Sequence, residues 1–233
     1  MTVTASRTRS ASPPTRSGWS GFMKFLIGVV LLAVLVVVGY AVLTGQIPGQ
    51  APQPAHSASA NPPVLIGEDP TYQFLAGDDG APRVRNCEPA TVLTEKKCGD
   101  LKIMIIDAGR MPWIARNIQL AWTQGKPSLL HRESTERPRR YRESCGRFTK
   151  TYTTGSCDEF PFASSLEGGN YLPGGARVEE VDIAEQRCQG GTVETTYRYR
   201  PIDPGEEYLV IIAQPEKIPA EAWAGQPVEA TQC

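Results

Sequence analysis

Hydrophobic residues are distributed very unevenly along the chain, with one long run near the N-terminus. Residues 25–43 are all apolar apart from two glycines and a tyrosine. Nineteen residues, at about 1.5 Å of rise each, form a helix of about 30 Å, which matches the thickness of a bilayer core. The pattern predicts one transmembrane helix within residues 19–44, in contact with the membrane over residues 22–44.

The alternative for this run is a long secretory signal peptide. Signal peptides usually have apolar regions of roughly 7–15 residues and end in small residues, whereas Leu43 is bulky. An uncleaved anchor is therefore favoured. The four basic residues before residue 45 precede the run without any acid, so the N-terminus is expected in the cytoplasm. The rest is expected outside the cell, membrane-anchored or, if the run is cleaved, secreted.

Two polar segments flank the run. Residues 1–18 are rich in Ser, Thr, Arg and Pro and lack apolar periodicity, which predicts a disordered cytoplasmic tail. Residues 45–63 carry five prolines among Gln, Ala and Ser. Because proline fixes φ and lacks a donor, this segment is expected to be a semi-rigid linker.

The remaining pattern predicts an α+β domain. Residues 64–100 read as an irregular or β-rich lead-in that contains two cysteines. Residues 101–106 and 208–213 are short, β-branched apolar runs, which are typical of buried strands. Residues 112–124 repeat apolar positions at helical spacing behind a proline, which predicts a helix with its stripe in the core. Residues 214–233 are expected to form a C-terminal tail.

A second group of elements is expected between these two strands. Residues 157–162 and residues 176–183 are each expected to form a strand. The Gly190-Gly191 pair is expected to end this region, and Thr192 to cap a helix that runs to Arg200. The Thr, Val and Tyr residues of this last segment also suit a strand, so both structures stay open here.

All six cysteines lie beyond the apolar run. An even number confined to the exported side is typical of an oxidising compartment and predicts up to three disulfides, although the sequence does not determine which cysteines pair. The alternative, a zinc site, is disfavoured because the chain has no Cys-x-x-Cys pair and only two histidines.

The charge of the exported part excludes a protein that binds nucleic acid through overall basicity. From residue 45 on, 20 Lys and Arg face 25 Asp and Glu, so the net charge is −5. Residues 126–150 nevertheless hold eight basic residues against three acids, with Arg139, Arg140 and Arg142 in the densest part. Arginines bond phosphate oxygens bidentately, and the neighbouring Tyr141 could pack on a sugar or base. The alternative is a solvated arginine-rich loop with internal ion pairs.

Three acids surround a short apolar patch after this basic segment. Asp158 and Glu159 precede Phe160-Pro161-Phe162-Ala163, and Glu167 follows eight residues after Glu159. Carboxylates beside apolar residues are partly desolvated, which raises their pKa and suits them to proton transfer or to binding a hard cation. The alternative is a surface hairpin with scattered, solvated acids.

The order of these residues resembles a known signature. The stretch from Asp158 to Ala163, with Glu167-Gly168-Gly169 at this spacing, closely resembles the motif of the NucA/NucB-type secreted deoxyribonucleases, small members of the ββα-metal nuclease group. The resemblance covers residues 101–213. It implies an α+β domain with a mixed or antiparallel sheet, in which two strands and a helix hold one divalent cation, Mg²⁺ or Mn²⁺.

The resemblance also implies roles for individual acids. No histidine lies near the motif in the sequence, and the family type uses an aspartate instead, which places the general base on Asp158. Glu159 and Glu167 match the other acids of the family, which bind or orient the metal. The metal ligand on the helix falls on Glu194.

Phosphate contacts follow from the same resemblance. Arg187 matches an arginine before the family's helix and is expected to clamp the scissile phosphate. Arg177 lies on a matching strand as a DNA contact, for which a structural salt bridge is the alternative. The segment with Arg139, Arg140 and Arg142 corresponds to a basic segment of the family and is expected to contact the DNA backbone.

These features together predict an exported, metal-dependent endonuclease that hydrolyses DNA with little sequence preference and needs no small-molecule cofactor. Two alternatives stay open. One is a non-catalytic, disulfide-stabilised ectodomain that is anchored in the membrane and binds a surface partner. The other is a nuclease toxin, with an immunity or inhibitor protein as its partner.

Overall fold

The computed structural model describes residues 61–228. The predicted cytoplasmic tail, the transmembrane span within residues 19–44, most of the linker and Cys233 lie outside the described residues. Among the helices of residues 61–228, none is long and apolar enough to cross a membrane.

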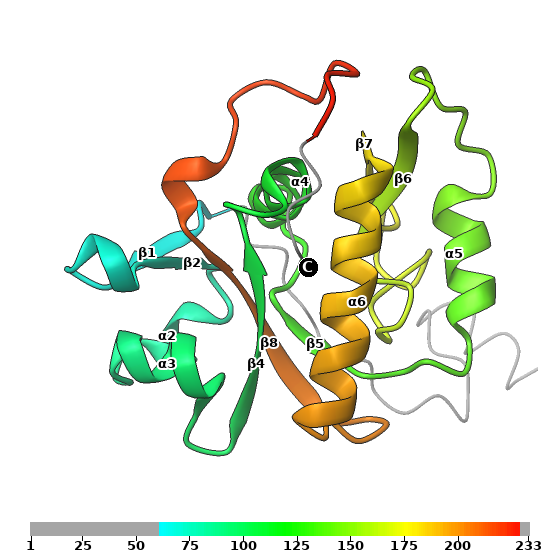
Figure 1. The fold of residues 1–233 in the computed structure, drawn as a ribbon. Coiled ribbons are helices and arrows are strands. Elements are labelled where there is room, and N and C mark those ends of the chain that lie inside the picture. Colours follow the sequence, from blue (N-terminus) through cyan, green and yellow to red (C-terminus); the bar gives the residue numbers. More distant parts are fainter. Residues whose placement is uncertain (1–60, 229–233) are drawn as a thin grey trace, which may run out of the picture. The chain divides into compact units, whose positions relative to one another are not determined.

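A six-stranded mixed sheet forms the centre of the fold (Figure 1). Its strands follow the spatial order β1 (Val64–Ile66), β2 (Phe74–Ala76), β8 (Glu207–Ala213), β4 (Leu101–Asp107) and β3 (Lys97–Cys98), and β5 (Leu129–His131) pairs with the first half of β8. The central pair β4 and β8 is parallel, and every other pair is antiparallel. The predicted α+β architecture with a mixed sheet is confirmed, as are the strands expected over residues 101–106 and 208–213.

The remaining elements are helices and one separate hairpin. The helices are α2 (Ala81–Val84), α3 (Pro89–Glu95), α4 (Pro112–Thr123), α5 (Arg137–Cys145) and α6 (Ile183–Tyr199), with the 3₁₀ turns η1 (Pro70–Tyr72) and η2 (Pro215–Lys217). The hairpin consists of β6 (Gly155–Phe160) and β7 (Arg177–Asp182).

Both faces of the central sheet are covered, which explains why β4 and β8 are continuous apolar runs. Ile103 and Leu209 belong to a buried cluster that includes residues of α2 and α3. Met104 and Val210, one position further along each strand, belong to a second cluster with α4. Successive side chains of a strand point to opposite faces, so one short run supplies both cores.

The helix predicted over residues 112–124 is confirmed as α4, with its proline in the first turn. Ile114 and Ile118 of its apolar stripe are fully buried. The cap of this helix comes from a distant part of the chain: Glu185 Oε2 accepts hydrogen bonds from the backbone N–H groups of Trp113 and Ile114, each at 3.1 Å. A carboxylate at this end also offsets the positive end of the helix dipole.

The hairpin and α6 form a continuous strand–strand–helix unit. Asp158 of β6 pairs in register with Glu179 of β7, and α6 begins at the residue after β7 ends. The two strands expected here are confirmed within two residues at their ends. Figure 1 shows α5 and α6 on either side of β6.

The expectation that Gly190-Gly191 ends a segment and that Thr192 starts a helix is wrong. Helix α6 begins at Ile183, capped by the Asp182 side chain, which accepts from the Ala184 N–H at 2.8 Å. Glycine inside a helix costs only about 1 kcal/mol relative to alanine. Buried residues on both sides of the pair, among them Cys188 and Thr196, anchor the helix on the core.

Disulfides occur as expected in the described part. Cys87 pairs with Cys98, which ties the start of α3 to β3, and Cys145 pairs with Cys157, which ties the end of α5 to β6. Cys188 is disulfide-bonded as well.

Candidate active site

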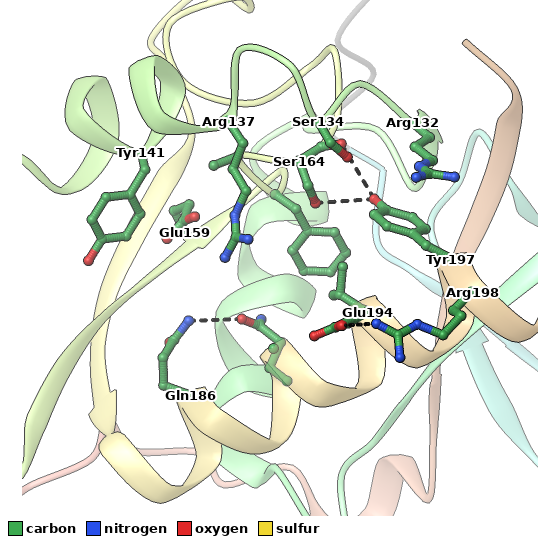
Figure 2. Close-up of a pocket in the computed structure, with 15 residues that line it drawn as sticks. Arg132, Ser134, Arg137, Tyr141, Glu159, Ser164, Gln186, Glu194, Tyr197 and Arg198 are labelled. Carbon is green, nitrogen blue, oxygen red and sulfur yellow. Dashed lines mark hydrogen bonds and ion pairs between the residues drawn. The ribbon is translucent and has the colours of Figure 1, made fainter. Parts of the chain in front are cut away.

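A pocket of about 570 Å³ opens between α5 and α6 at the end of β6 (Figure 2). Cations, carboxyls, amides and aromatic rings share this cavity. Its lining residues are Arg132, Ser134, Arg137, Tyr141, Glu159, Phe162, Ala163, Ser164, Gln186, Gln189, Gly190, Val193, Glu194, Tyr197 and Arg198.

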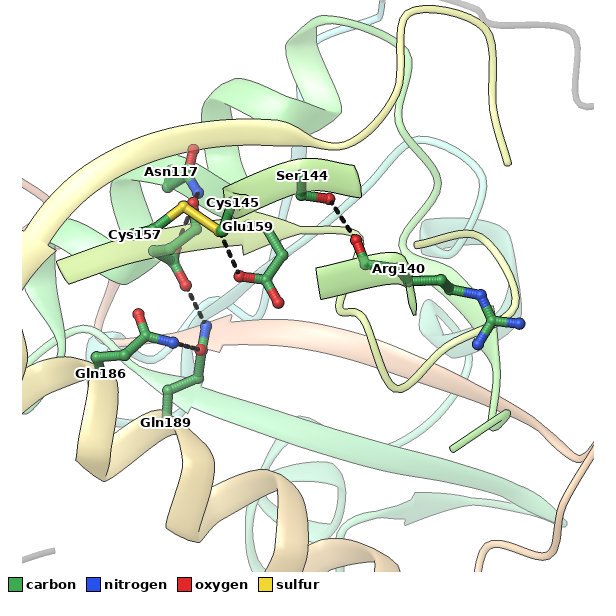
Figure 3. The surroundings of a disulfide bond; sticks show 9 residues. Asn117, Arg140, Ser144, Cys145, Cys157, Glu159, Gln186 and Gln189 are labelled. Atoms are coloured by element: carbon green, nitrogen blue, oxygen red, sulfur yellow. Dashed lines mark hydrogen bonds between the residues drawn. A yellow bond between two sulfur atoms is a disulfide. The ribbon is translucent and has the colours of Figure 1, made fainter. Parts of the chain in front are cut away.

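Asp158 lies behind this pocket and is completely buried. Asn117 Nδ2 donates to its Oδ2 and Gln189 Nε2 donates to its Oδ1, each at 2.8 Å (Figure 3). Burial raises the pKa of Asp158 to about 6, although these two hydrogen bonds act in the opposite direction. Gln189 itself lines the pocket, so one side chain separates Asp158 from the cavity.

Glu159 is the carboxyl in the floor of the pocket, with 8% of its surface exposed. It is adjacent to Asp158 on β6 and therefore points to the opposite face of the hairpin. Burial and, to a smaller extent, the charge of Asp158 raise the pKa of Glu159 to about 8, although the charge of Arg137 acts in the opposite direction.

The Cys145–Cys157 disulfide lies directly beside this carboxyl. Cys145 Sγ is 3.3 Å from Glu159 Oε2 (Figure 3). The ligand atoms of Cys145, Cys157 and Glu159 all lie within 4.8 Å of one another, as in a metal site. Both sulfurs are oxidised in the disulfide, however, and only a thiolate ligates a metal. The disulfide therefore fixes α5 against β6, and its sulfurs do not form a thiolate metal site.

Glu185, on the first turn of α6, was not among the predicted site residues. Burial raises its pKa to about 8, and the hydrogen bonds from the start of α4 lower it. Its Oε2 caps α4, while its Oε1 is buried without a hydrogen-bond partner in residues 61–228. The order Asp182-x-x-Glu185 is a helix-start signal in the sequence, and it could have revealed where α6 begins.

Buried oxygens around Asp158 fit a hard divalent cation. In the described part of the chain, Asn117 Oδ1, Glu185 Oε1 and Gln186 Oε1 are buried and accept no hydrogen bond. Asn117 and Gln186 belong to one hydrogen-bonded group, because Asn117 and Gln189 bond Asp158, and Gln186 Nε2 donates to Gln189 Oε1 at 3.0 Å. Glu185 is close enough to Asp158 for the charge of one carboxyl to act on the other. Mg²⁺ and Mn²⁺ prefer ligand sets made of oxygen.

Glu167 occupies a different environment from the other predicted acids. It is buried, and both of its oxygens contact His131: Oε1 lies 2.7 Å from Nδ1, and Oε2 accepts from the backbone N–H at 3.0 Å. The interpretation that no histidine is near the motif is therefore wrong: His131 is distant in the sequence but contacts Glu167 in the folded chain. Glu167 is not among the residues that line the pocket.

Two of the predicted site residues, Glu194 and Arg187, lie exposed on α6 but differ in position. Glu194 lines the pocket and pairs with Arg198 one turn later, at 2.6 Å. Arg187 lies outside the pocket lining. The structure thus brings Glu159 and Glu194 to one cavity and leaves Glu167 and Arg187 outside it.

Three of the four arginines predicted to contact DNA already have carboxylate partners. Arg139 pairs with Glu136 and Glu143 on the surface of α5, buried Arg140 pairs with Glu133 at 2.6 Å, and Arg177 pairs with Glu179 at 2.6 Å. Arg142 is exposed, and none of the four lines the pocket. The internal ion pairs weighed as an alternative are therefore present at three positions.

The cation that faces the pocket from α5 is Arg137. Its exposed guanidinium makes no ion pair with any residue of the described chain. On the opposite side, the Arg132 guanidinium lies 4.9 Å from the centre of the Tyr197 ring. The Tyr197 hydroxyl is held by Ser164 at 3.1 Å and by Tyr208 at 2.9 Å, so this wall is fixed by the core.

Comparison with protein families agrees with this geometry. Residues 118–211 match the family model described as deoxyribonuclease NucA/NucB. The match begins within α4, includes α5, the hairpin and α6, and ends within β8. No curated protein matches the chain. The resemblance predicted from the acidic motif is confirmed.

Proposed function

Because residues 118–211 match the NucA/NucB deoxyribonuclease family model, we propose that the protein is an exported, metal-dependent endonuclease that hydrolyses DNA with little sequence preference. The observation that carries this proposal is the pocket between α5 and α6. There the charge of Arg137 acts on Glu159, and Gln189 connects the buried Asp158 to the cavity.

Phosphodiester hydrolysis requires that a water molecule loses a proton as it attacks phosphorus. In this proposal, Asp158 accepts the proton from the water; it is the buried carboxyl that Gln189 connects to the pocket. The hydrogen bonds from Asn117 and Gln189 favour its ionised form and hold its oxygens in place. Glu159, on the other face of the strand, is placed to orient the phosphate or to donate a proton to an oxygen of it.

The cation would be held by the free oxygens of Asn117, Glu185 and Gln186. When bound, a divalent cation neutralises charge that develops on the phosphate and stabilises the leaving oxygen. Glu194 is a further carboxylate on the pocket wall. Glu167, in contrast, is assigned to positioning His131 and the segment around it.

The residues that face the pocket also suggest how the substrate is held. Arg137 and Arg132 can donate to phosphate oxygens, which are the same in every nucleotide. Contacts to the backbone carry no sequence information directly, so little sequence preference is expected. Exposed Arg142 and Arg187 could extend these contacts along the strand.

The disulfides support a site of action outside the cytoplasm. Disulfides such as Cys87–Cys98 and Cys145–Cys157 form and persist in oxidising compartments and are rare in the cytosol. The anchored location, with secretion as its alternative, rests on the apolar run of residues 25–43.

A plasmid-nicking assay with the full chain tests the proposal. We expect nicking with Mg²⁺ or Mn²⁺ and none with a chelator. The D158N variant, which has the same shape but cannot accept the proton, should lose at least about 10²-fold in rate. Absence of nicking with any divalent cation would favour a non-catalytic ectodomain. Full activity of D158N would refute the assignment of the base and leave the nuclease proposal in place.

A further inference from the structure

Tyr141 stands out among the tyrosines because its ring is exposed within the pocket. The side chain is 45% exposed, and it lines the cavity from α5 (Figure 2). The Tyr141 side chain makes no hydrogen bond and no aromatic ring contact with any residue between 61 and 228. In contrast, Tyr152 packs edge-to-face against Trp223, and Tyr197 packs edge-to-face against Tyr208. Within the described residues, the Tyr141 hydroxyl and ring therefore have no specific partner.

Arg137 lies one helical turn before Tyr141, and side chains four residues apart share one face of a helix. This face of α5 thus presents an unpaired cation and an unpaired aromatic ring to the same pocket. In Figure 2 the Glu159 carboxyl lies between the two side chains. Since the charge of Arg137 acts on Glu159, a phosphate bound by Arg137 would lie close to that carboxyl.

We propose that this pocket binds an unpaired nucleotide, with its base stacked on Tyr141 and its phosphate on Arg137, so that single-stranded DNA is the preferred substrate. The inference rests on the proposed nuclease function and names the substrate class of the same site. Stacking on an aromatic side chain is tolerant of sequence, because every base has a π face.

The dimensions of the pocket favour an unpaired strand over a duplex. A volume of about 570 Å³ lies in the range of sites that enclose one small ligand. Within a duplex, both faces of each base are covered by neighbouring bases, so the ring could stack only after a base leaves the helix. In a single strand this cost is smallest, and the base can enter beside Glu159 directly.

The first test measures stacking without turnover. The full chain is titrated, with a chelator present, into a single-stranded oligonucleotide that contains the fluorescent base 2-aminopurine, whose emission is quenched by stacking. The wild type and Y141F should quench the emission, because phenylalanine keeps the ring. Y141A should lose this quenching and bind about tenfold more weakly. The matched control is Y199A, since Tyr199 is 70% exposed on α6 but lies outside the pocket lining, and it should behave like the wild type.

The second test measures cleavage with Mg²⁺ of the same sequence as a single strand and as a closed duplex. We expect a higher kcat/KM for the single strand, and Y141A should lose this preference through a higher KM. If the wild type cuts DNA but Y141A quenches like the wild type, or the duplex is cut as fast as the single strand, the inference is wrong and the nuclease function stands. If nothing is cut but quenching depends on Tyr141, the stacking site stands and the proposed activity falls.

Discussion

Gln189 Nε2 lies 2.8 Å from Asp158 Oδ1 and is the connection between a completely buried carboxyl and the pocket. The same amide accepts from Gln186 at 3.0 Å, which fixes its orientation. Gln189 therefore lies between Asp158 and the cavity and keeps the Asp158 oxygen in place.

The Q189L variant should lower kcat about 10- to 100-fold, because a hydrogen bond to a charged group contributes about 1.5–3 kcal/mol. Leucine keeps most of the volume, so KM should change little. Steady-state cleavage of a labelled oligonucleotide measures both constants.

The matched control is Q214L. Gln214 Nε2 donates to Asp107 Oδ1 at 2.9 Å, an equivalent amide–carboxylate bond just beyond the end of β8. This variant should keep wild-type kinetics. Equal activity of both variants would show that Gln189 has no part in the reaction.

Removing the Cys145–Cys157 disulfide should reduce activity more than its effect on stability explains. The bond closes a loop of 12 residues, so the C145S/C157S variant should lose about 3 kcal/mol of unfolding free energy. It also holds α5, with Arg137 and Tyr141, against β6. A small misplacement of such groups is costly, so kcat/KM should fall by at least about tenfold.

The other disulfide is a suitable control, because Cys87 and Cys98 are separated by 11 residues and lie away from the pocket. Urea unfolding should show a similar loss for C87S/C98S, whereas nicking by the variant that remains folded should continue at the wild-type rate. A parallel loss of activity in both variants would assign the effect to stability alone.

The elements that the sequence predicts well are those whose pattern is set locally. The predictions for β4, β8 and α4 are confirmed. A strand or helix that is buried in a core carries apolar residues at the spacing typical of that element, and this spacing is visible in the sequence. The predicted helix start at Thr192 is wrong, because α6 is capped by Asp182 and continues through Gly190-Gly191. Packing on the core outweighed the helix-breaking tendency of the glycines.

The acidic motif lies at the candidate site, but its sequence does not predict the partners of each side chain. Contacts between His131 and Glu167, or between Arg140 and Glu133, depend on how separate elements pack, and spacing along the chain does not encode this. Glu185 was missed for the same reason, since its cap on α4 joins residues 71 positions apart. Tyr141 was singled out as a contact to a sugar or base, and its exposed place in the pocket is consistent with this.

Glu133 should stabilise the fold above about pH 4.5 and lose this effect in acid. Burial raises its pKa, but hydrogen bonds from Thr135 and Arg140 outweigh burial and bring the pKa down to about 2. A folded pKa below the ordinary value means that the stabilisation is complete above the ordinary pKa and disappears as the pH falls from about 4.5 to 2. We expect E133Q to lose about 2 kcal/mol at pH 7 in urea unfolding, and the difference from wild type to shrink towards pH 2.

The control is E136Q, because Glu136 pairs with Arg139 on the solvent-exposed surface of α5. Exposed ion pairs contribute about 0–1 kcal/mol, so this variant should differ little from wild type at any pH. A constant difference between E133Q and wild type from pH 7 to pH 2 would contradict the assignment.

Glu185 should be required for cation binding, whereas Glu194 should not be. Mn²⁺ at about 100 times its dissociation constant should stabilise the folded chain by about 2.7 kcal/mol, which thermal unfolding detects as a rise in Tm. The E185Q variant keeps an oxygen that can cap Trp113 and Ile114, so it should fold, but it loses the charge next to the free Oε1. We expect Mn²⁺ to raise the Tm of wild type and E194Q and to leave that of E185Q unchanged. The reverse result would place the cation at the exposed carboxylate on the wall of the pocket, as the family resemblance first implied.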